Sequence, residues 1–257
     1  ISDDEGLLPP FIISNFTEGL DTDNSTNLIL ASPNLYNTVL DETSALTMRT
    51  GTELAYTLPV SSTVPLLNSF IAVYDDGSSE FIVHAGSGIY VTGGNDVWTC
   101  IKNGVSSKYM MQFVMVNGEV WITNGVDSLG IWNKQTFTQY SFIPKGRFIT
   151  TDKEQVLIAG MFADPSVVRV SSLFTTQGLY SSGKNIYDWY DYNQLPCGLG
   201  DGQIITGLFT QDNKVYVTKN KSIYGLLTTA NYADPNTTQV YLYTTQYGSV
   251  SQRSIAN

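Results

Sequence analysis

The amino-acid sequence repeats one pattern of short β-strands, and this repeat restricts the fold more than any other feature. The two clearest copies are Phe113–Gly125, which leads into Ser128–Trp132, and Leu208–Asn220, which leads into Ser222–Leu226. Each copy places an Asn-Gly or Asp-Asn pair between two runs of alternating apolar residues, which is the pattern of a half-buried β-hairpin. A second turn then leads to a third strand, so each copy predicts a small antiparallel sheet.

Looser copies begin at Ile71 and Phe148, so the unit recurs about every 40 residues. A sheet-sized unit with this period is typical of a β-propeller. We therefore predict an all-β fold, a β-propeller with about four blades, at residues 66–102, 108–143, 146–200 and 203–246. Residues 247–257 resemble the opening of another blade. We expect an incomplete propeller, with the chain truncated at its C-terminus rather than closed by its N-terminal part.

Residues 1–65 differ from the remainder, because they combine a Pro-Pro pair and three further prolines with polar stretches. This composition is typical of irregular chain. We expect an N-terminal arm over residues 1–65, with short strands at 11–13, 28–30 and 53–58. The propeller domain is expected to follow over residues 66–257.

Composition excludes some classes of function. The 257-residue chain has 42% hydrophobic and only 14% charged residues, a mixture that suits sheets and argues against disorder. Its formal net charge is -10, since 13 Lys and Arg face 23 Asp and Glu. Affinity for phosphates comes largely from Lys and Arg, so tight binding of nucleic acid is not expected, whereas DNA could pass along an acidic wall without being held. No apolar run reaches the roughly 18 residues that a membrane helix needs.

The sequence also offers few groups for catalysis. His84 is the only histidine, so a Ser-His-Asp or Cys-His mechanism would need a base from another subunit. We expect His84 to be packed on a strand. Cys100 and Cys197 lie far apart in the sequence, and we expect two free thiols. The sequence thus predicts no catalytic set, no cofactor and no metal site.

A carbohydrate-binding or glycan-cleaving β-propeller is the alternative hypothesis. Paired carboxylates cleave glycosidic bonds when they lie at a suitable separation. Two of the candidates, Asp75 and Asp76, lie in the hairpin turn before Gly77. Asp is favoured in such turns because its side chain forms hydrogen bonds with the nearby backbone, so a turn role is the expected one for both. The candidate carboxylates are those of Asp75, Asp76, Asp188, Asp191 and Asp201.

Aromatic residues supply the other feature of this alternative. Residues 178–200 form a longer excursion in the third predicted blade, and the run Ile186–Tyr192 within it alternates aromatic and acidic residues. Aromatic rings that are exposed on a loop can stack on sugars or nucleobases. For Trp98, Trp121 and Trp132, which fall on or beside predicted strands, packing between blades is the expected role. We therefore predict a contact platform formed by Tyr187, Trp189, Tyr190 and Tyr192.

Short phrases occur at both ends of the chain. Asn15–Thr22 and Met48–Gly51 are similar to a GGLNT phrase and an R-x-G phrase, although Glu18 replaces the usual glycine. Gly200–Gly207, Ser222–Leu226 and Gly248–Ile255 are similar to a stretch with G-D-x-I-T, SIY and G-x-V-S-x-R-S-V. In these phrases the chain resembles the propeller-type virion proteins of tailed bacteriophages, the tail nozzle and tail tubular-like proteins.

The resemblance implies a non-enzymatic structural protein in the virion. Such a protein forms part of a ring, in the nozzle, neck or tail hub, around the channel through which DNA leaves. The resemblance also implies a homo-oligomer, commonly a hexamer, that contacts other phage tail or portal-adaptor proteins. DNA would pass transiently through this oligomer. In this family further blades follow the phrase that contains Arg253 and Ser254.

Overall fold

The structure is a computed structural model. It describes residues 59–61, 63–94, 97–172, 189–191, 193–229, 232, 234 and 237–252, together with short strands closer to the N-terminus. The chain divides into two compact units, Ile1–Ala55 and Tyr56–Asn257. All regular elements that the structure describes are β-strands.

The first unit contains two small sheets. Strands β1 (Gly19–Leu20) and β2 (Ala31–Ser32) pair in parallel, and β3 (Thr38–Leu40) pairs antiparallel with β4 (Leu46–Met48). The strands predicted at 11–13, 28–30 and 53–58 lie outside the described residues. Two of the phrases that carry the resemblance, around Asn15 and Arg49, also lie largely outside them.

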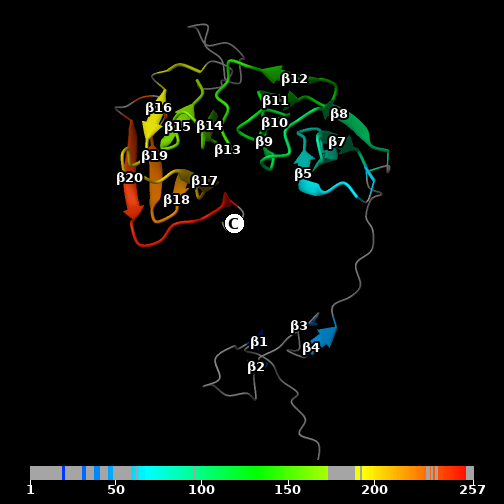
Figure 1. Cartoon of the computed structure of the whole chain (residues 1–257), viewed down its shortest axis with the longest axis horizontal. Coiled ribbons are helices and arrows are strands. Elements are labelled where there is room, and N and C mark those ends of the chain that lie inside the picture. Colours follow the sequence, from blue (N-terminus) through cyan, green and yellow to red (C-terminus); the bar gives the residue numbers. More distant parts are fainter. Residues whose placement is uncertain are drawn as a thin grey trace, which may run out of the picture. The chain divides into compact units, whose positions relative to one another are not determined.

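The second unit contains four four-stranded antiparallel sheets, and in each the strands follow one another in chain order (Figure 1). The first sheet is β5 (Leu66–Val73), β6 (Ser79–Ala85), β7 (Gly88–Thr92) and β8 (Thr99–Asn103). The second is β9 (Gln112–Val116), β10 (Glu119–Thr123), β11 (Leu129–Trp132) and β12 (Phe137–Tyr140). The third is β13 (Phe148–Asp152), β14 (Gln155–Ala159), β15 (Val167–Val170) and β16 (Gln194–Pro196). The fourth is β17 (Ile205–Gln211), β18 (Lys214–Lys219), β19 (Ile223–Thr228) and β20 (Thr238–Thr244).

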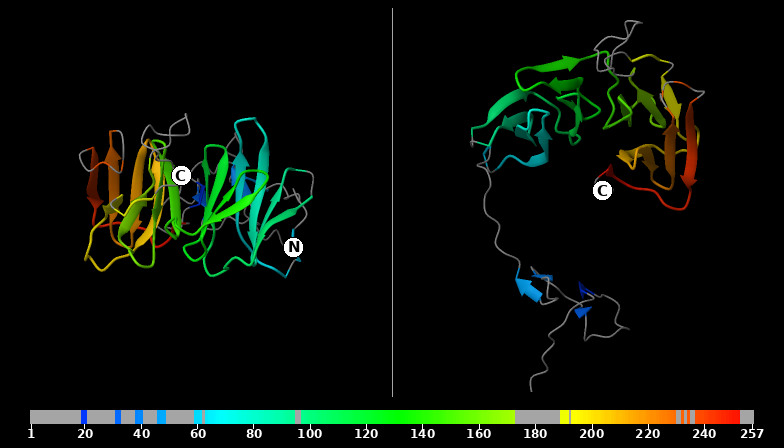
Figure 2. Two further views of the ribbon diagram at one scale, coloured as in Figure 1. Left: turned by 90° about the horizontal axis from the view of Figure 1, so that it is seen from above. Right: turned by 180° about the vertical axis from the view of Figure 1, so that it is seen from behind.

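These sheets are the blades of a β-propeller. The first strand of each sheet contacts the first strand of the next, β5 to β9, β9 to β13 and β13 to β17. The sheets therefore follow one another along an arc, with their first strands on the inner side and their fourth strands on the outer side (Figures 1 and 2). The predicted all-β propeller with four visible blades is confirmed. Of the excursion predicted at residues 178–200, Gln194–Pro196 form β16, and residues 178–188 lie outside the described residues.

The core consists of three apolar layers, one between each pair of adjacent blades. Trp132 packs in the layer between blades 1 and 2, and Trp121 in the layer between blades 2 and 3. Blades 3 and 4 share the layer that contains Leu157 and Val217. Since burial of one large apolar side chain contributes about 1.5–3 kcal/mol, these layers hold the blades together. The packing role predicted for Trp121 and Trp132 is thus observed.

Tight turns connect the first two strands of blades 2, 3 and 4. Each turn holds two consecutive residues with positive φ: Asn117 and Gly118, Lys153 and Glu154, Asp212 and Asn213. Two such residues form the turn that best fits the twist of a hairpin, and Asn, Asp and Gly tolerate it best. The sequence marks two of these turns clearly, whereas Lys153-Glu154 adopts the same conformation without the favoured residues. Within the described residues, no helix is both long and apolar enough to span a bilayer.

The turns offer a matched test of this local geometry. Glu154 (φ 59°) and Gly118 (φ 75°) occupy the same turn position in neighbouring blades. Left-handed backbone costs a residue with a Cβ about 1 kcal/mol, so Glu154→Gly should raise the free energy of unfolding by about 0.5–1 kcal/mol. Gly118→Glu should lower the free energy of unfolding by a similar amount, because the new residue must adopt the left-handed backbone. No steric clash adds to this cost, since a Cβ on Gly118 would meet no atom within 4 Å. Urea unfolding of both variants checks this, and equal signs for the two changes would contradict it.

Candidate functional site

A cavity opens where loops of blades 2, 3 and 4 meet. Its larger part, about 590 Å³, adjoins a smaller part of about 360 Å³, and Lys108, Tyr109, Arg147 and Ile204 line both. Three of its lining segments lead into the inner strands β9, β13 and β17. The others come from the turns between the second and third strands of blades 2, 3 and 4 and from residues 250–252 after β20. We call this cavity the Arg147 pocket.

Two glycines hold the side chain of Arg147 in place. Gly125 and Gly160 have positive φ, and both lie against this side chain. A Cβ on Gly125 would come within 2.4 Å of Arg147 Cγ, and one on Gly160 within 3.2 Å of Arg147 Cβ. The guanidinium lies over the ring of Tyr109, with Cζ 4.3 Å from the ring centroid. The fold thus sets the position of the one guanidinium group in the pocket.

The pocket is basic in an acidic protein. Arg147 is half-buried and Lys108 is exposed, and neither forms an ion pair with a described carboxylate. Among the residues that the structure describes, no Asp or Glu lines either part of the cavity. A half-buried guanidinium without a counter-charge in a concave site is suited to bind an anionic group.

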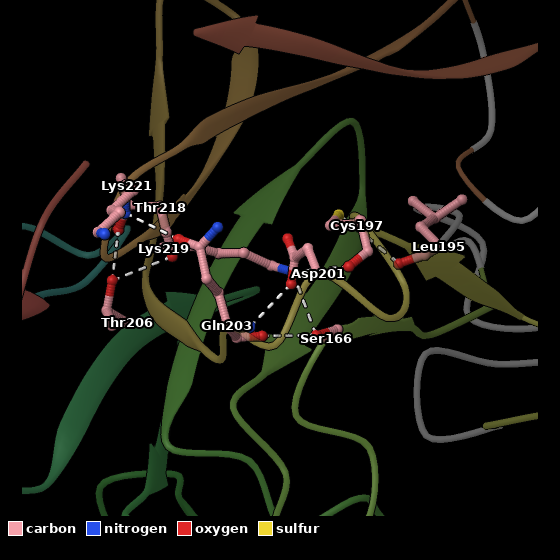
Figure 3. Close-up of polar contacts among 10 residues, drawn as sticks. Ser166, Leu195, Cys197, Asp201, Gln203, Thr206, Thr218, Lys219 and Lys221 are labelled. Atoms are coloured by element: carbon pink, nitrogen blue, oxygen red, sulfur yellow. Dashed lines mark hydrogen bonds and ion pairs between the residues drawn. The ribbon is translucent and has the colours of Figure 1, made fainter. Parts of the chain in front are cut away.

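A second constellation surrounds Lys219 at the end of β18. The side chain of Lys219 is fully buried, and its ammonium donates hydrogen bonds to both carboxylate oxygens of Asp201, at 3.0 and 2.9 Å. It also donates to Gly198 O and Ser166 Oγ, both at 3.1 Å. Figure 3 shows Lys219 extended toward Asp201, with Ser166 beside them. Every donor of the ammonium is therefore used within the protein.

Three of the phrases that carry the resemblance meet around this lysine. Gly200–Gly207 supplies Asp201, and Tyr224 of Ser222–Leu226 lies with its ring centroid 5.5 Å from Lys219 Nζ. In Gly248–Ile255, a Cβ on Gly248 would come within 2.1 Å of Lys219 O, and Ser249 N donates to that same carbonyl. These phrases therefore have a structural role, because they fasten blade 3 to blade 4 and the last described residues to β17 and β18.

The described nucleophile and base candidates are not activated. Burial raises the pKa of the Cys197 thiol to about 12, so it stays protonated at neutral pH. Burial also lowers the pKa of His84, which is fully buried and therefore stays neutral. Cys100 and Cys197 are both free thiols, as predicted. Among the described residues, no group of three or more His, Cys, Asp and Glu could hold a metal ion.

The carboxylates considered for glycan cleavage lie in separate places. Asp76 pairs with Lys134 at 2.6 Å, Asp191 with Arg169 at 2.9 Å and Asp201 with Lys219 at 2.9 Å. Asp75 is exposed in the β5–β6 turn, and Asp188 lies outside the described residues. Because three of the candidates each have a cation of their own, they do not form the carboxylate pair that this chemistry requires.

The predicted contact platform is described only in part. Trp189 is half-buried and packs against the apolar layer between blades 2 and 3. Tyr190 is half-buried, and its carbonyl accepts a hydrogen bond from Arg169 Nη2 at 3.3 Å. Tyr187 and Tyr192 lie outside the described residues.

Sequence reasoning missed both the Arg147 pocket and Lys219. A possible signal for the pocket was the position of Lys108 and Arg147, each just before the first strand of a repeat unit. For Lys219, the signal was a charged residue placed directly after the predicted strand residues Val215–Thr218. Neither signal tells which loops meet in space, so the sequence alone could not assemble either site.

The Lys219–Asp201 pair gives a pH dependence. Burial alone would raise the pKa of Asp201, but hydrogen bonds from Lys219 and Gln203 N outweigh it and hold this pKa below its ordinary value. The resulting stability is present above the unfolded-state pKa of about 3.9 and is lost as pH falls through the lower folded-state pKa. Asp201→Asn should thus cost about 2–3 kcal/mol at pH 7, and its difference from wild type should shrink below about pH 4.

Urea unfolding between pH 7 and 3 measures this difference. Asp191→Asn is the control, because the Asp191 side chain is fully exposed and solvent screens its ion pair with Arg169, so its loss should change stability little. A difference between wild type and Asp201→Asn that stays constant down to pH 3 would contradict the assignment.

Comparisons with known proteins identify no family. No family model matches the chain, and no curated protein matches it. Among solved structures, a streptogramin B lyase is 16% identical with a TM-score of 0.47, over 74% of this chain and 57% of that one. The N-terminal domain of Nup159 is 10% identical with a TM-score of 0.40, over 61% of this chain and 44% of that one. The chain thus spans less than two thirds of either structure, and similarity this low carries no information about its ligand or activity.

Proposed function

We propose that this chain is part of a non-enzymatic structural protein in the virion of a tailed phage. Its blades would form part of a ring around the DNA exit channel. The observation that carries the proposal is that both ends of the arc present apolar blade faces of the kind that is buried between blades elsewhere. The phrases similar to phage propeller proteins support it independently.

The face of blade 4 that points away from blade 3 carries a row of aromatic side chains. Phe209, Tyr216, Gly225 and Tyr241 are paired across all four strands of the sheet, so they share one face. Phe209 stacks on Tyr216 with ring centroids 5.3 Å apart, and Tyr243 meets Tyr216 edge-on at 6.4 Å. Tyr243 is 66% exposed. No further sheet covers this face in the described part of the chain.

The face of blade 1 that points away from blade 2 is also apolar. In β5, Phe70 and Ala72 pack toward blade 2, so the alternate residues Ile71 and Val73 point to the other face. Ile71 is 63% exposed and Val73 is 62% exposed. Contiguous exposed apolar surface of this kind is typical of interaction sites.

The two end faces suit each other. Each blade has one face toward the following blade in the sequence and one face toward the preceding blade. Inside the arc, the face of one blade toward the following blade packs on the face of that next blade toward the preceding one. The open face of blade 4 is of the first kind, and the open face of blade 1 is of the second. A second copy, or a further blade of the kind that the resemblance implies, can therefore repeat the same packing, and head-to-tail contacts between copies form a ring where the rotation between them closes.

The surface charge fits a channel that DNA passes. With a net charge of -10, the chain is not expected to hold the phosphate backbone of DNA. Cys197 and His84 are buried, and Asp76, Asp191 and Asp201 each pair with a cation, which fits a structural role. Other tail or portal-adaptor proteins would be the remaining partners.

Purified virions test the proposed location. Quantitative mass spectrometry of particles from a phage that encodes this chain should find it at a fixed copy number that matches a ring, such as six per particle. The tail sheath or portal of the same particles serves as the internal standard. Absence of the polypeptide from intact particles would refute the proposal.

Sedimentation of the purified chain tests the end faces. Ile71→Asp and Tyr243→Asp should each shift the chain toward the monomer, raising the dissociation constant about tenfold or more, because each places a charge in an apolar contact. Phe142→Asp is the matched control, since Phe142 is 63% exposed on blade 2, both of whose faces are covered. Equal self-association of wild type and all three variants would contradict the end-face contact.

A further inference from the structure

The Arg147 pocket has the size and composition of a site for a small ligand. Its larger part, about 590 Å³, falls within the range of roughly 300–1,000 Å³ of typical ligand pockets. Met161 and Ile205 are buried apolar lining residues, while Phe162 is fully exposed and Ile204 is 48% exposed. The pocket thus combines an apolar wall with an apolar rim.

One polar group in this apolar surround is fixed in position. Arg147 lies against Gly125 and Gly160, and its guanidinium forms a cation-π contact with Tyr109, with Cζ 4.3 Å from the ring centroid. Lys108 adds a second cation, 5.2 Å above the same ring. A guanidinium presents paired donors that match the two oxygens of a carboxylate or the oxygens of a phosphate.

From these observations we infer that the Arg147 pocket binds a small amphipathic anion, a flat apolar body that carries one carboxylate, sulfonate or phosphate group. The anionic group pairs with Arg147, with Lys108 beside it, and the apolar body lies against Met161, Phe162 and Ile205. This site is separate from the end faces of blades 1 and 4, so it does not depend on self-association.

Paired fluorescent probes test the inference on the whole chain. The probe 8-anilinonaphthalene-1-sulfonate has the required anion, and N-phenyl-1-naphthylamine has the same ring system without it. A hydrogen bond to a charged group contributes about 1.5–3 kcal/mol, so Arg147→Gln should weaken binding of the sulfonate roughly 10- to 100-fold. The same change should alter binding of the neutral probe by less than about twofold.

Two further variants separate loss of charge from loss of fold. Arg147→Lys keeps the cation and should retain most of the sulfonate binding. Lys145→Gln removes an exposed cation two residues away that does not line the pocket, and it should change binding by less than about twofold. Thermal unfolding of each variant verifies that the blades stay folded.

Competition identifies the anionic group. Displacement of the sulfonate by 2-naphthoate or by 2-naphthyl phosphate supports the site, and the stronger competitor identifies its preferred group. The Tyr243→Asp variant should bind the sulfonate as wild type does, which excludes the blade 4 face as the binding site. Equal binding of the sulfonate by wild type and Arg147→Gln, or failure of both competitors, would overturn the inference.

Discussion

Packing of one blade face against the next is the interaction on which the rest of this structure depends. Each sheet is apolar on both faces, so a single blade cannot bury its own surface and is stable only between neighbours. Trp121 and Trp132 illustrate this, because they lie on adjacent strands of one blade and pack toward opposite neighbours. The same requirement leaves the outer faces of blades 1 and 4 in need of a covering surface.

Polar interactions add to the stability that this apolar packing provides. Lys219 and Asp201 join the loop after β16 to the end of β18, and Ser249 and Gln252 then attach the last described residues to β18 and the inner strand β17. In the same way Glu80 of blade 1 accepts a hydrogen bond from Trp132 Nε1 of blade 2 at 2.8 Å. The Lys219–Asp201 and Trp132–Glu80 contacts join segments of neighbouring blades, so they fix how the blades are arranged and not how each blade folds.

The fold could be predicted from the sequence because turns and strands depend on residues that are close together in the sequence. Asn117-Gly118 and Asp212-Asn213 mark hairpin turns, and the unbroken apolar run Phe113–Val116 marks a strand with two covered faces. The sites could not be predicted, because they are assembled from loops that are far apart in the sequence. Gly125, Arg147 and Gly160 come together only once blades 2 and 3 are packed, and nothing local to Arg147 distinguishes it from an exposed loop arginine.

An experimental structure of the chain in its assembled state, by cryo-electron microscopy, tests the central claim most directly. The account predicts copies joined head to tail, with the Tyr216 and Tyr243 face of one blade 4 packed on the Ile71 and Val73 face of the neighbouring blade 1. An assembly that leaves both faces in solvent, or sheets stacked as a two-layer sandwich in place of the arc, would contradict it.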